Sequence, residues 1–180
     1  YGTAVHAALE AYFRQRMLGV SLKVEALLEV LDDSWIHQGF VSLRHEEERR
    51  LAASETIRRL WLEFESQELD IIDVERAFQA SFDDYKVKIR GRYDLLLRTT
   101  KGVEIRDFKT SAVKDLKTAQ ARVRDSVPMQ IYALAWESSL EAHDDPLSSI
   151  SLQFVDSGIL AQRDKMNHSR TRAQIEVVAK

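Results

Sequence analysis

The sequence predicts an α/β (α+β) fold in which a central mixed sheet, containing an antiparallel meander, is flanked by helices. Two observations predict it. Apolar residues recur at helical spacing through the first third of the chain, whereas residues 74–109 change to the two-residue alternation of strands. Helical patterns then return, and a last strand-like run follows Pro146. Helices, a meander, then helices and a strand indicate one sheet covered by helices.

Three helices are expected before the sheet. Thr3 is the expected cap of the first helix, which ends near Met17. The apolar side of this helix would consist of Val5, Leu9, Tyr12 and Phe13. The second pattern covers residues 23–35. The third covers residues 43–67, where "HEEERR" is typical of a solvent-exposed face.

Three strands are expected next, at residues 74–82, 86–97 and 103–109. In "YKVKIR" the side chains alternate, with Tyr85, Val87 and Ile89 on one face and Lys86, Lys88 and Arg90 on the other. "TTKG" predicts the turn between the last two strands. The remaining expected elements are helices at 114–124 and 126–142, a strand at 150–155 and a helix from about Arg170.

Composition limits the class of protein. The chain has 180 residues, of which 44% are hydrophobic and 31% charged, as in an ordinary globular domain. It has no cysteine, which excludes disulfides, thiolate zinc sites and cysteine-ligated iron–sulfur clusters. No apolar run approaches the ~20 residues that a membrane span needs, so no membrane partner is expected. The net charge is −3, and any attraction to nucleic acid must therefore be local.

The segment "EIRDFKTS" places charged residues in a strand-like run, where they are rare. If "TTKG" forms a two- or four-residue loop, Arg98 faces Val103 and Asp94 faces Asp107. Facing side chains stand about 4.5–5.5 Å apart at Cβ, so two carboxylates repel unless a divalent cation bridges them. Alternation puts Lys109 on the same face. Carboxylates with few other ligands suit Mg²⁺ or Mn²⁺.

Two other interpretations of this segment stay open. An Asp–Lys salt bridge on a solvated sheet face would explain the D-x-K tripeptide without any chemistry. A three-residue loop with a bulge would offset the strands by one residue, and the two aspartates would then not face each other.

"GRYDLLL", a hairpin and "VEIRDFKTS" together resemble the core of the PD-(D/E)XK nuclease superfamily, which has a restriction-endonuclease-like fold. The leading "YGTAVHAALEAYF" and trailing "QIYALAW" resemble its RecB-like branch, whose nuclease domains are fused to UvrD-, RecB- and AddAB-type helicases. The matches, in the branch's motif order, are Gly2/His6, Gly91/Asp94, Asp107/Phe108/Lys109/Thr110 and Tyr132/Ala133. One departure is that Pro128 stands where the branch has the glutamine of Q-x-x-x-Y, and Gln130 follows two residues later.

The resemblance implies a single nuclease domain over residues 1–180, cut from a larger helicase–nuclease, since "YGTAVHAALE" lacks Met and is already helical. It implies a metal-dependent deoxyribonuclease, an exonuclease acting on single-stranded or unwound DNA in repair or recombination. The implied partners are DNA and a helicase domain in the same chain or complex. The implied location is the cytoplasm, in association with the nucleoid.

The resemblance also assigns roles to residues. His6, Asp94 and Asp107, with the Phe108 carbonyl, would hold Mg²⁺ or Mn²⁺. Asp94, Asp107 and Lys109 would be catalytic, because the lysine orients the attacking water or stabilises charge on the phosphate. Candidates for an accessory role are the acids Glu75 and Glu10.

DNA contacts are expected beside the catalytic strand, because residues 109–124 hold five basic residues and one acid. The residues expected to bind DNA are Thr110, Lys114, Lys117, Gln130 and Tyr132. The competing hypotheses are a catalytically inactive nuclease-like fold that serves as a DNA-binding or protein-docking scaffold, and an unrelated phosphate-binding α/β domain.

Overall fold

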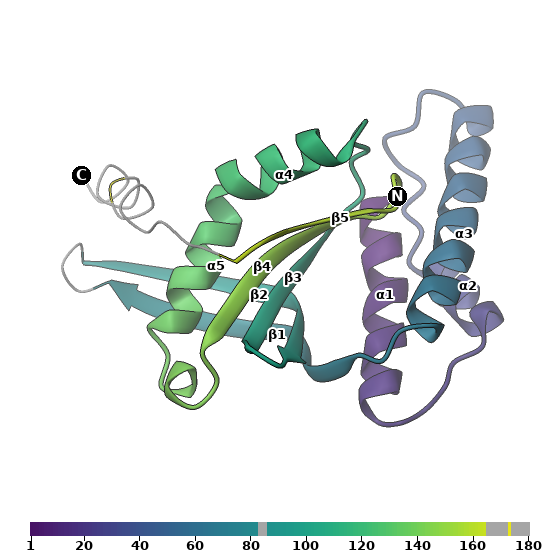
Figure 1. Cartoon of the computed structure of the whole chain (residues 1–180). Helices are drawn as coiled ribbons and strands as arrows, with labels where there is room; N and C mark the ends of the chain where they lie inside the picture. The colour runs from purple at the N-terminus through teal and green to yellow at the C-terminus, as the bar shows by residue number, and fades with distance from the viewer. Residues whose placement is uncertain (83–85, 165–172, 174–180) are drawn as a thin grey trace.

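A computed structural model of the chain describes residues 1–82, 86–164 and 173, and shows one sheet with helices on both faces (Figure 1). The helices are α1 (Gly2–Met17), α2 (Val24–Asp33), α3 (Leu43–Glu65), α4 (Leu116–Asp125) and α5 (Val127–Glu137), with a short 3-10 helix, η2 (Glu141–His143). The strands are β1 (Asp70–Phe82), β2 (Val87–Thr99), β3 (Gly102–Lys109), β4 (Leu147–Phe154) and β5 (Ile159–Arg163). The predicted α/β fold, a mixed sheet flanked by helices, is confirmed.

The five strands lie in the order β1-β2-β3-β4-β5. Neighbouring strands are antiparallel except β3 and β4, which run parallel and are joined by a crossover that contains α4 and α5. A parallel pair needs a crossover of this kind, since a tight turn can only reverse the chain. Arg98 lies opposite Val103, so the predicted hairpin register is confirmed and the bulged alternative is excluded.

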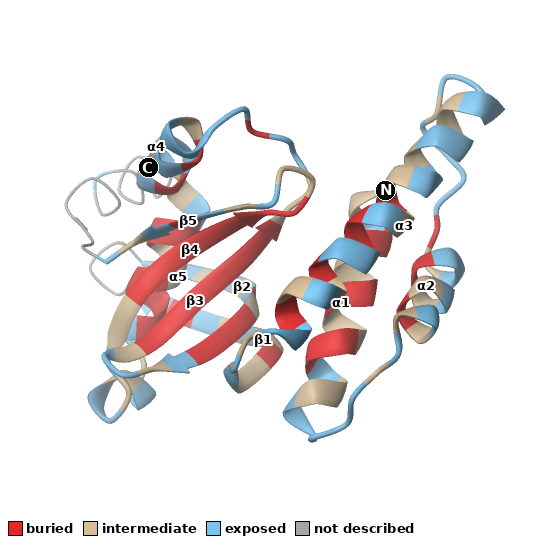
Figure 2. Ribbon diagram, turned by 45° about the vertical axis from the view of Figure 1, so that its right-hand side comes forward, coloured by how far each residue is buried: buried red, intermediate tan, exposed pale blue. Residues whose placement is uncertain are grey.

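Two hydrophobic cores support the sheet, one on each face. On one face, α1 and α3 pack against the sheet and α2 packs against these two helices. Phe108 of β3 stacks on Phe13 of α1 with ring centroids 5.6 Å apart. On the other face, α4 and α5 cover apolar residues of β3 and β4, such as Ile105 and Ile150. Strands β3 and β4 are buried along most of their length (Figure 2). A strand covered on both faces is held rigidly, and β3 carries the D-x-K segment.

The helix boundaries differ from the sequence reading at a few points. Helix α1 begins at Gly2, with Tyr1 as its cap residue, so Thr3 lies in the first turn and is not the cap. The four apolar residues expected on its inner side are all buried. The helix expected to reach residue 142 ends at Glu137, because η2 is a separate turn. The helix expected from about Arg170 falls on residues that, apart from Ala173, lie outside the described part of the chain.

The sheet has one strand that was not predicted from the sequence. Strand β5, "ILAQR", is five residues long and alternates too briefly to be recognised by period alone. It pairs with β4 at the edge of the sheet, where Ala161 lies opposite Leu152. Tyr85, assigned from the alternation of "YKVKIR", is outside the described residues.

Two motif glycines allow close approaches that shape the site. A Cβ on Gly2 would lie 3.2 Å from Oγ1 of Thr110, so the start of α1 packs directly on the end of β3. A Cβ on Gly91 would lie 2.5 Å from the ring of Phe78. That ring is itself fixed, because it stacks on Tyr93 at 4.5 Å and meets Tyr132 edge-on at 5.6 Å.

The change Gly91→Ala should therefore lower the free energy of unfolding by about 1–3 kcal/mol, since the added methyl group overpacks a fixed aromatic cluster. Urea unfolding measures this loss. In a Phe78→Leu background the smaller side chain leaves room, and the same substitution should then cost much less. An equal cost in both backgrounds would contradict the steric explanation.

Candidate active site

Helix α1 brings His6 to the sheet. The residues of α1 at helical spacing around it, such as Val5 and Leu9, are buried, which fixes the rotation of the helix about its axis. His6 Nδ1 then lies 3.6 Å from Oδ2 of Asp94, and the imidazole remains about one-third exposed. A partly exposed imidazole beside a carboxylate can bind a metal ion.

Asp94 lies where β2 separates from β3. The last β2–β3 pair before this point is Leu95 with Arg106. Oδ2 of Asp94 accepts a hydrogen bond of 2.9 Å from the backbone N–H of Phe108. The side chain thus takes the place of a backbone acceptor at the point where the ladder ends. This bond fixes the carboxylate at the mouth of the gap between the strands.

Glu75 faces Asp94 from the other side. Val74 pairs with Leu95 and Arg76 with Tyr93, so the β1–β2 register puts Glu75 opposite Asp94. Glu75 has φ of 52°, in the left-handed region that residues other than glycine seldom adopt. Such strain persists only where the surrounding structure imposes it, and it is concentrated at functional sites.

His6, Glu75 and Asp94 form a group of potential metal ligands. One nitrogen or oxygen from each lies within 4.8 Å of the others. One imidazole and two carboxylates form a donor set that suits Mn²⁺ and, with water completing the shell, Mg²⁺. The sequence reading gave Glu75 only an accessory role. Its position became apparent from the register of β1 against β2, which the sequence does not reveal.

The carboxylate of Asp94 is electrostatically strained. Burial, followed by repulsion from Asp107, raises its pKa to about 6, and repulsion from Glu75 adds to this effect. The Phe108 N–H and His6 act in the opposite direction and favour the ionised form. A divalent cation would favour it strongly, so the residues present fit a metal site.

Asp107 and Lys109 lie on the same face of β3, as predicted. Lys109 Nζ is 2.6 Å from Asp107 Oδ2, and Asp107 is only 3% exposed while the lysine side chain is 42% exposed. The angles at this contact are not those of a hydrogen bond, and this carboxylate oxygen has no other partner among the described residues. Asp107 therefore carries a buried oxygen that can accept a further ligand, with an ammonium group beside it.

The other residues predicted from the sequence differ in how they are placed relative to the candidate site. Glu10 pairs with Arg14 at 2.7 Å and is not in the group formed by His6, Glu75 and Asp94. Thr110 is half-buried against Gly2. Lys114 and Lys117 are exposed near the start of α4, on the surface expected to meet DNA.

The two predicted DNA contacts on α5 differ from each other. Tyr132 is half-buried, and its pKa is raised to about 12, first by burial and then by the negative charges of Asp107, Asp94 and Glu75. Its phenol therefore lies beside the carboxylates. Gln130 is 5% exposed and its amide donates to the carbonyl of Arg124 at 2.9 Å. That burial does not fit the expected DNA contact, and Gln130 instead ties α5 to the end of α4.

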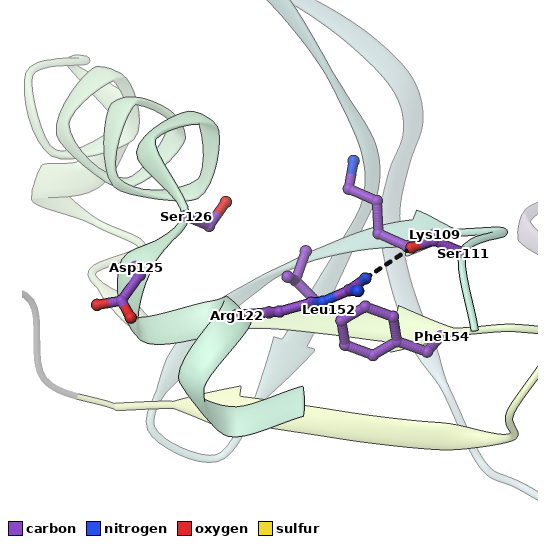
Figure 3. Close-up of a pocket in the computed structure, with 7 residues that line it drawn as sticks. All are labelled: Lys109, Ser111, Arg122, Asp125, Ser126, Leu152 and Phe154. Carbon is purple, nitrogen blue, oxygen red and sulfur yellow. Dashed lines mark hydrogen bonds between the residues drawn. The ribbon is translucent and has the colours of Figure 1, made fainter. Parts of the chain in front are cut away.

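A pocket of about 330 Å³ opens beside Lys109 (Figure 3). Its lining residues are Lys109, Ser111, Arg122, Asp125, Ser126, Leu152 and Phe154. Arg122 lies over the ring of Phe154 at 5.6 Å and donates to Ser111 Oγ at 2.9 Å, so its guanidinium is held in place. Two cations and two hydroxyl groups next to the D-x-K segment can bind a phosphate group.

The comparisons with known proteins agree with this geometry. A sequence model of the PD-(D/E)XK nuclease superfamily matches residues 1–179. The chain belongs to the PD-(D/E)XK nuclease superfamily. Among curated proteins no match was found. The restriction-endonuclease-like fold expected from the resemblance is therefore confirmed, while the RecB-like branch remains a prediction.

Membership in this superfamily gives the cluster a chemical context. Nucleases of this superfamily use divalent metal ions, and the described residues include one cluster of suitable ligands. The absence of cysteine excludes a cysteine-ligated iron–sulfur cluster within this chain. Within the described ranges, no helix has the length and apolar character needed to cross a membrane.

The repulsion at Asp94 leads to a pH-dependent prediction. The folded pKa of about 6 exceeds the unfolded value of about 3.9, so ionisation destabilises the fold and the metal-free protein loses stability as pH rises from about 4 to 6. Asp94→Asn removes the charge and keeps an oxygen for the Phe108 N–H. In EDTA at pH 8 it should raise the free energy of unfolding by up to about 3 kcal/mol.

Chemical denaturation at a series of pH values measures this difference. The two proteins should approach each other near pH 4, where Asp94 is protonated in the folded chain and about half protonated in the unfolded chain. A gain that is the same at pH 4 and pH 8 would show that the substitution acts through packing and not through charge.

Proposed function

We propose that this domain is a metal-dependent deoxyribonuclease of the RecB-like branch, which hydrolyses phosphodiester bonds with Mg²⁺ or Mn²⁺. The observation that carries the proposal is the convergence of His6, Glu75 and Asp94 within 4.8 Å, beside the Asp107–Lys109 pair, in a chain of the PD-(D/E)XK superfamily. Inactive scaffolds on a nuclease fold have no need for such a strained group of carboxylates.

Each side chain has a role in this proposal. His6, Glu75 and Asp94 hold the cation, and Asp107 supplies a further oxygen from its buried carboxylate. A cation held by these residues would polarise the scissile phosphate and would lower the pKa of an attacking water. Lys109 donates hydrogen bonds to that water or to the phosphate oxygens, where negative charge grows in the transition state.

The neighbouring surfaces support DNA as the substrate. The pocket lined by Arg122, Ser111 and Lys109 offers donors for a phosphate of the strand next to the scissile bond. Lys114 and Lys117 extend this positive surface along the start of α4. We further propose exonucleolytic action on single-stranded or unwound DNA in repair or recombination. A helicase in the same chain or complex would deliver the strand at high local concentration, in the cytoplasm and at the nucleoid.

Metal dependence is the direct test. Mn²⁺ or Mg²⁺ should support degradation of a labelled single-stranded oligonucleotide, and EDTA should abolish it. Either metal should also raise the melting temperature by mass action. Glu75→Gln should reduce this thermal shift, because it removes a charged ligand, whereas Glu10→Gln should leave it intact. Cleavage that persists in excess chelator would contradict the proposal.

Substitutions of Asp107 and Lys109 should have different effects on metal binding and on turnover. Asp107→Asn should weaken metal affinity and lower kcat. Lys109→Met should lower kcat at least 100-fold with metal affinity kept, since an ammonium group cannot ligate a cation. Isothermal titration with Mn²⁺ and single-turnover cleavage give the two quantities. Lys101→Met, in the exposed turn just before β3, is the matched control and should change neither. Loss of metal affinity in Lys109→Met alone would reverse these roles.

A further inference from the structure

The hairpin of β1 and β2 extends beyond the rest of the sheet (Figure 1). Strand β2 pairs with β3 only from Leu95 to Thr99, while its pairing with β1 continues to Val87. Residues 75–82 and 87–94 therefore form a two-stranded ribbon, here called the β1–β2 ribbon. Its tip, residues 83–85, lies outside the described part of the chain.

One face of the β1–β2 ribbon is covered. Phe78 and Tyr93 stack on this face with ring centroids 4.5 Å apart. Tyr132 and Trp136 of α5 pack edge-on against them, at 5.6 and 6.1 Å. Helix α5 thus supports the ribbon from behind and holds it in a fixed direction relative to the carboxylates.

The opposite face is exposed and positively charged. Strand alternation places Lys88, Arg90 and Arg92 on that face, away from Tyr93, and all three side chains are exposed. Their partners across the hairpin are Ser81, Gln79 and Ala77 in turn. Among the described residues of the ribbon the acids are Glu75 and Asp94, both at the end next to the candidate metal site, so Lys88 and Arg90 are not neutralised from within it.

The row of cations ends at the candidate metal site. Arg92 contacts Glu75 at 3.2 Å, and Glu75 lies opposite Asp94, the next residue of β2 on this face. Arg90 donates to Gln79 at 2.9 Å, while Lys88 has no ion-pair partner among the described residues. Positive charges therefore lead along one strand directly to His6, Glu75 and Asp94.

From this arrangement we infer that the exposed face of the β1–β2 ribbon binds the phosphate backbone of a DNA single strand and directs it to the carboxylates. Alternate residues of a strand are about 6.8 Å apart. Lys88, Arg90 and Arg92 therefore present positive charge at regular intervals along the direction in which a phosphate backbone can lie.

A single strand fits this face better than a duplex, because the cations lie in one row on β2 while their partners on β1, Ala77, Gln79 and Ser81, carry no charge. The chain as a whole has a net charge of −3, so the ribbon supplies a local attraction where no general one exists. The delivery of the strand to the carboxylates rests on the proposed function, whereas the binding of DNA by the β1–β2 ribbon does not.

The test is the salt dependence of binding to a labelled single-stranded oligonucleotide, measured by fluorescence anisotropy with the whole chain in EDTA. Removing two phosphate contacts by Lys88→Gln with Arg90→Gln should reduce the slope of log K against log salt by about 1.4. Between 1 M and 0.1 M salt this difference in slope corresponds to a change of about 25-fold in relative affinity. The double variant Arg58→Gln with Lys101→Gln removes the same charge from exposed sites off the ribbon and should leave the slope unchanged.

Two further arms make the outcome decisive. Lys88→Arg with Arg90→Lys keeps both charges and should retain the wild-type slope. A duplex closed by hairpins at both ends should show little difference between the wild-type protein and the glutamine variant. The inference would be overturned if the wild-type protein and the glutamine variant had equal slopes on single-stranded DNA. It would also be overturned if the control variant lost as much affinity, or if the glutamine variant lost affinity only for the closed duplex.

Because EDTA prevents metal-dependent cleavage, this experiment does not depend on hydrolysis. A protein that never cleaves DNA with Mn²⁺, yet shows the expected slope difference, would disprove the proposed function and leave the ribbon as a DNA-binding surface. A protein that cleaves DNA but shows no slope difference would support the proposed function and would overturn the inference that the ribbon binds DNA.

Discussion

The convergence of negative charge at the edge of the β2–β3 pairing is the constraint on which the site depends. Glu75, Asp94 and Asp107 come from three neighbouring strands, and both Glu75 and Asp107 repel the carboxylate of Asp94. Repulsion between facing carboxylates destabilises a sheet, and it persists here because the strands are fixed by packing elsewhere. The hydrogen bond from the Phe108 N–H to Asp94 stabilises the ionised form locally. It also sets the place where β2 turns away from β3 and the ribbon begins.

The two hydrophobic cores provide the rigidity that this arrangement requires. Phe108, next to Asp107 in the chain, points to the opposite face and stacks on Phe13 of α1, the same helix that carries His6. The packing that holds β3 thus also fixes the imidazole. On the other face, α5 packs against both the sheet and the ribbon, and its Tyr132 lies beside the carboxylates. A shift of either helix would change the distances between the ligands.

The charged residues around the site are separated by sign. The acids lie at the centre, where a divalent cation would offset their repulsion. Cations lie on both sides of them, with Lys88, Arg90 and Arg92 on the ribbon and Lys109 and Arg122 around the pocket. A negatively charged strand can approach a negatively charged metal site only if the cation is bound and the flanking surface is positive. The net charge of the chain, −3, does not reveal this separation.

The sequence by itself determined the order of helices and strands as far as β4, the hairpin register across "TTKG" and the placement of Asp107 and Lys109 on one face. These features follow from local periodicity and turn chemistry, which act over a few residues. Motif order was enough to identify the superfamily. Only the tertiary structure decided that Glu75 and not Glu10 joins His6 and Asp94, that Gln130 is buried, and that β3 and β4 run parallel. These depend on how β1 aligns with β2 and how α1 and α5 dock on the sheet. Contacts between residues so far apart in the chain leave no periodic signal in the sequence.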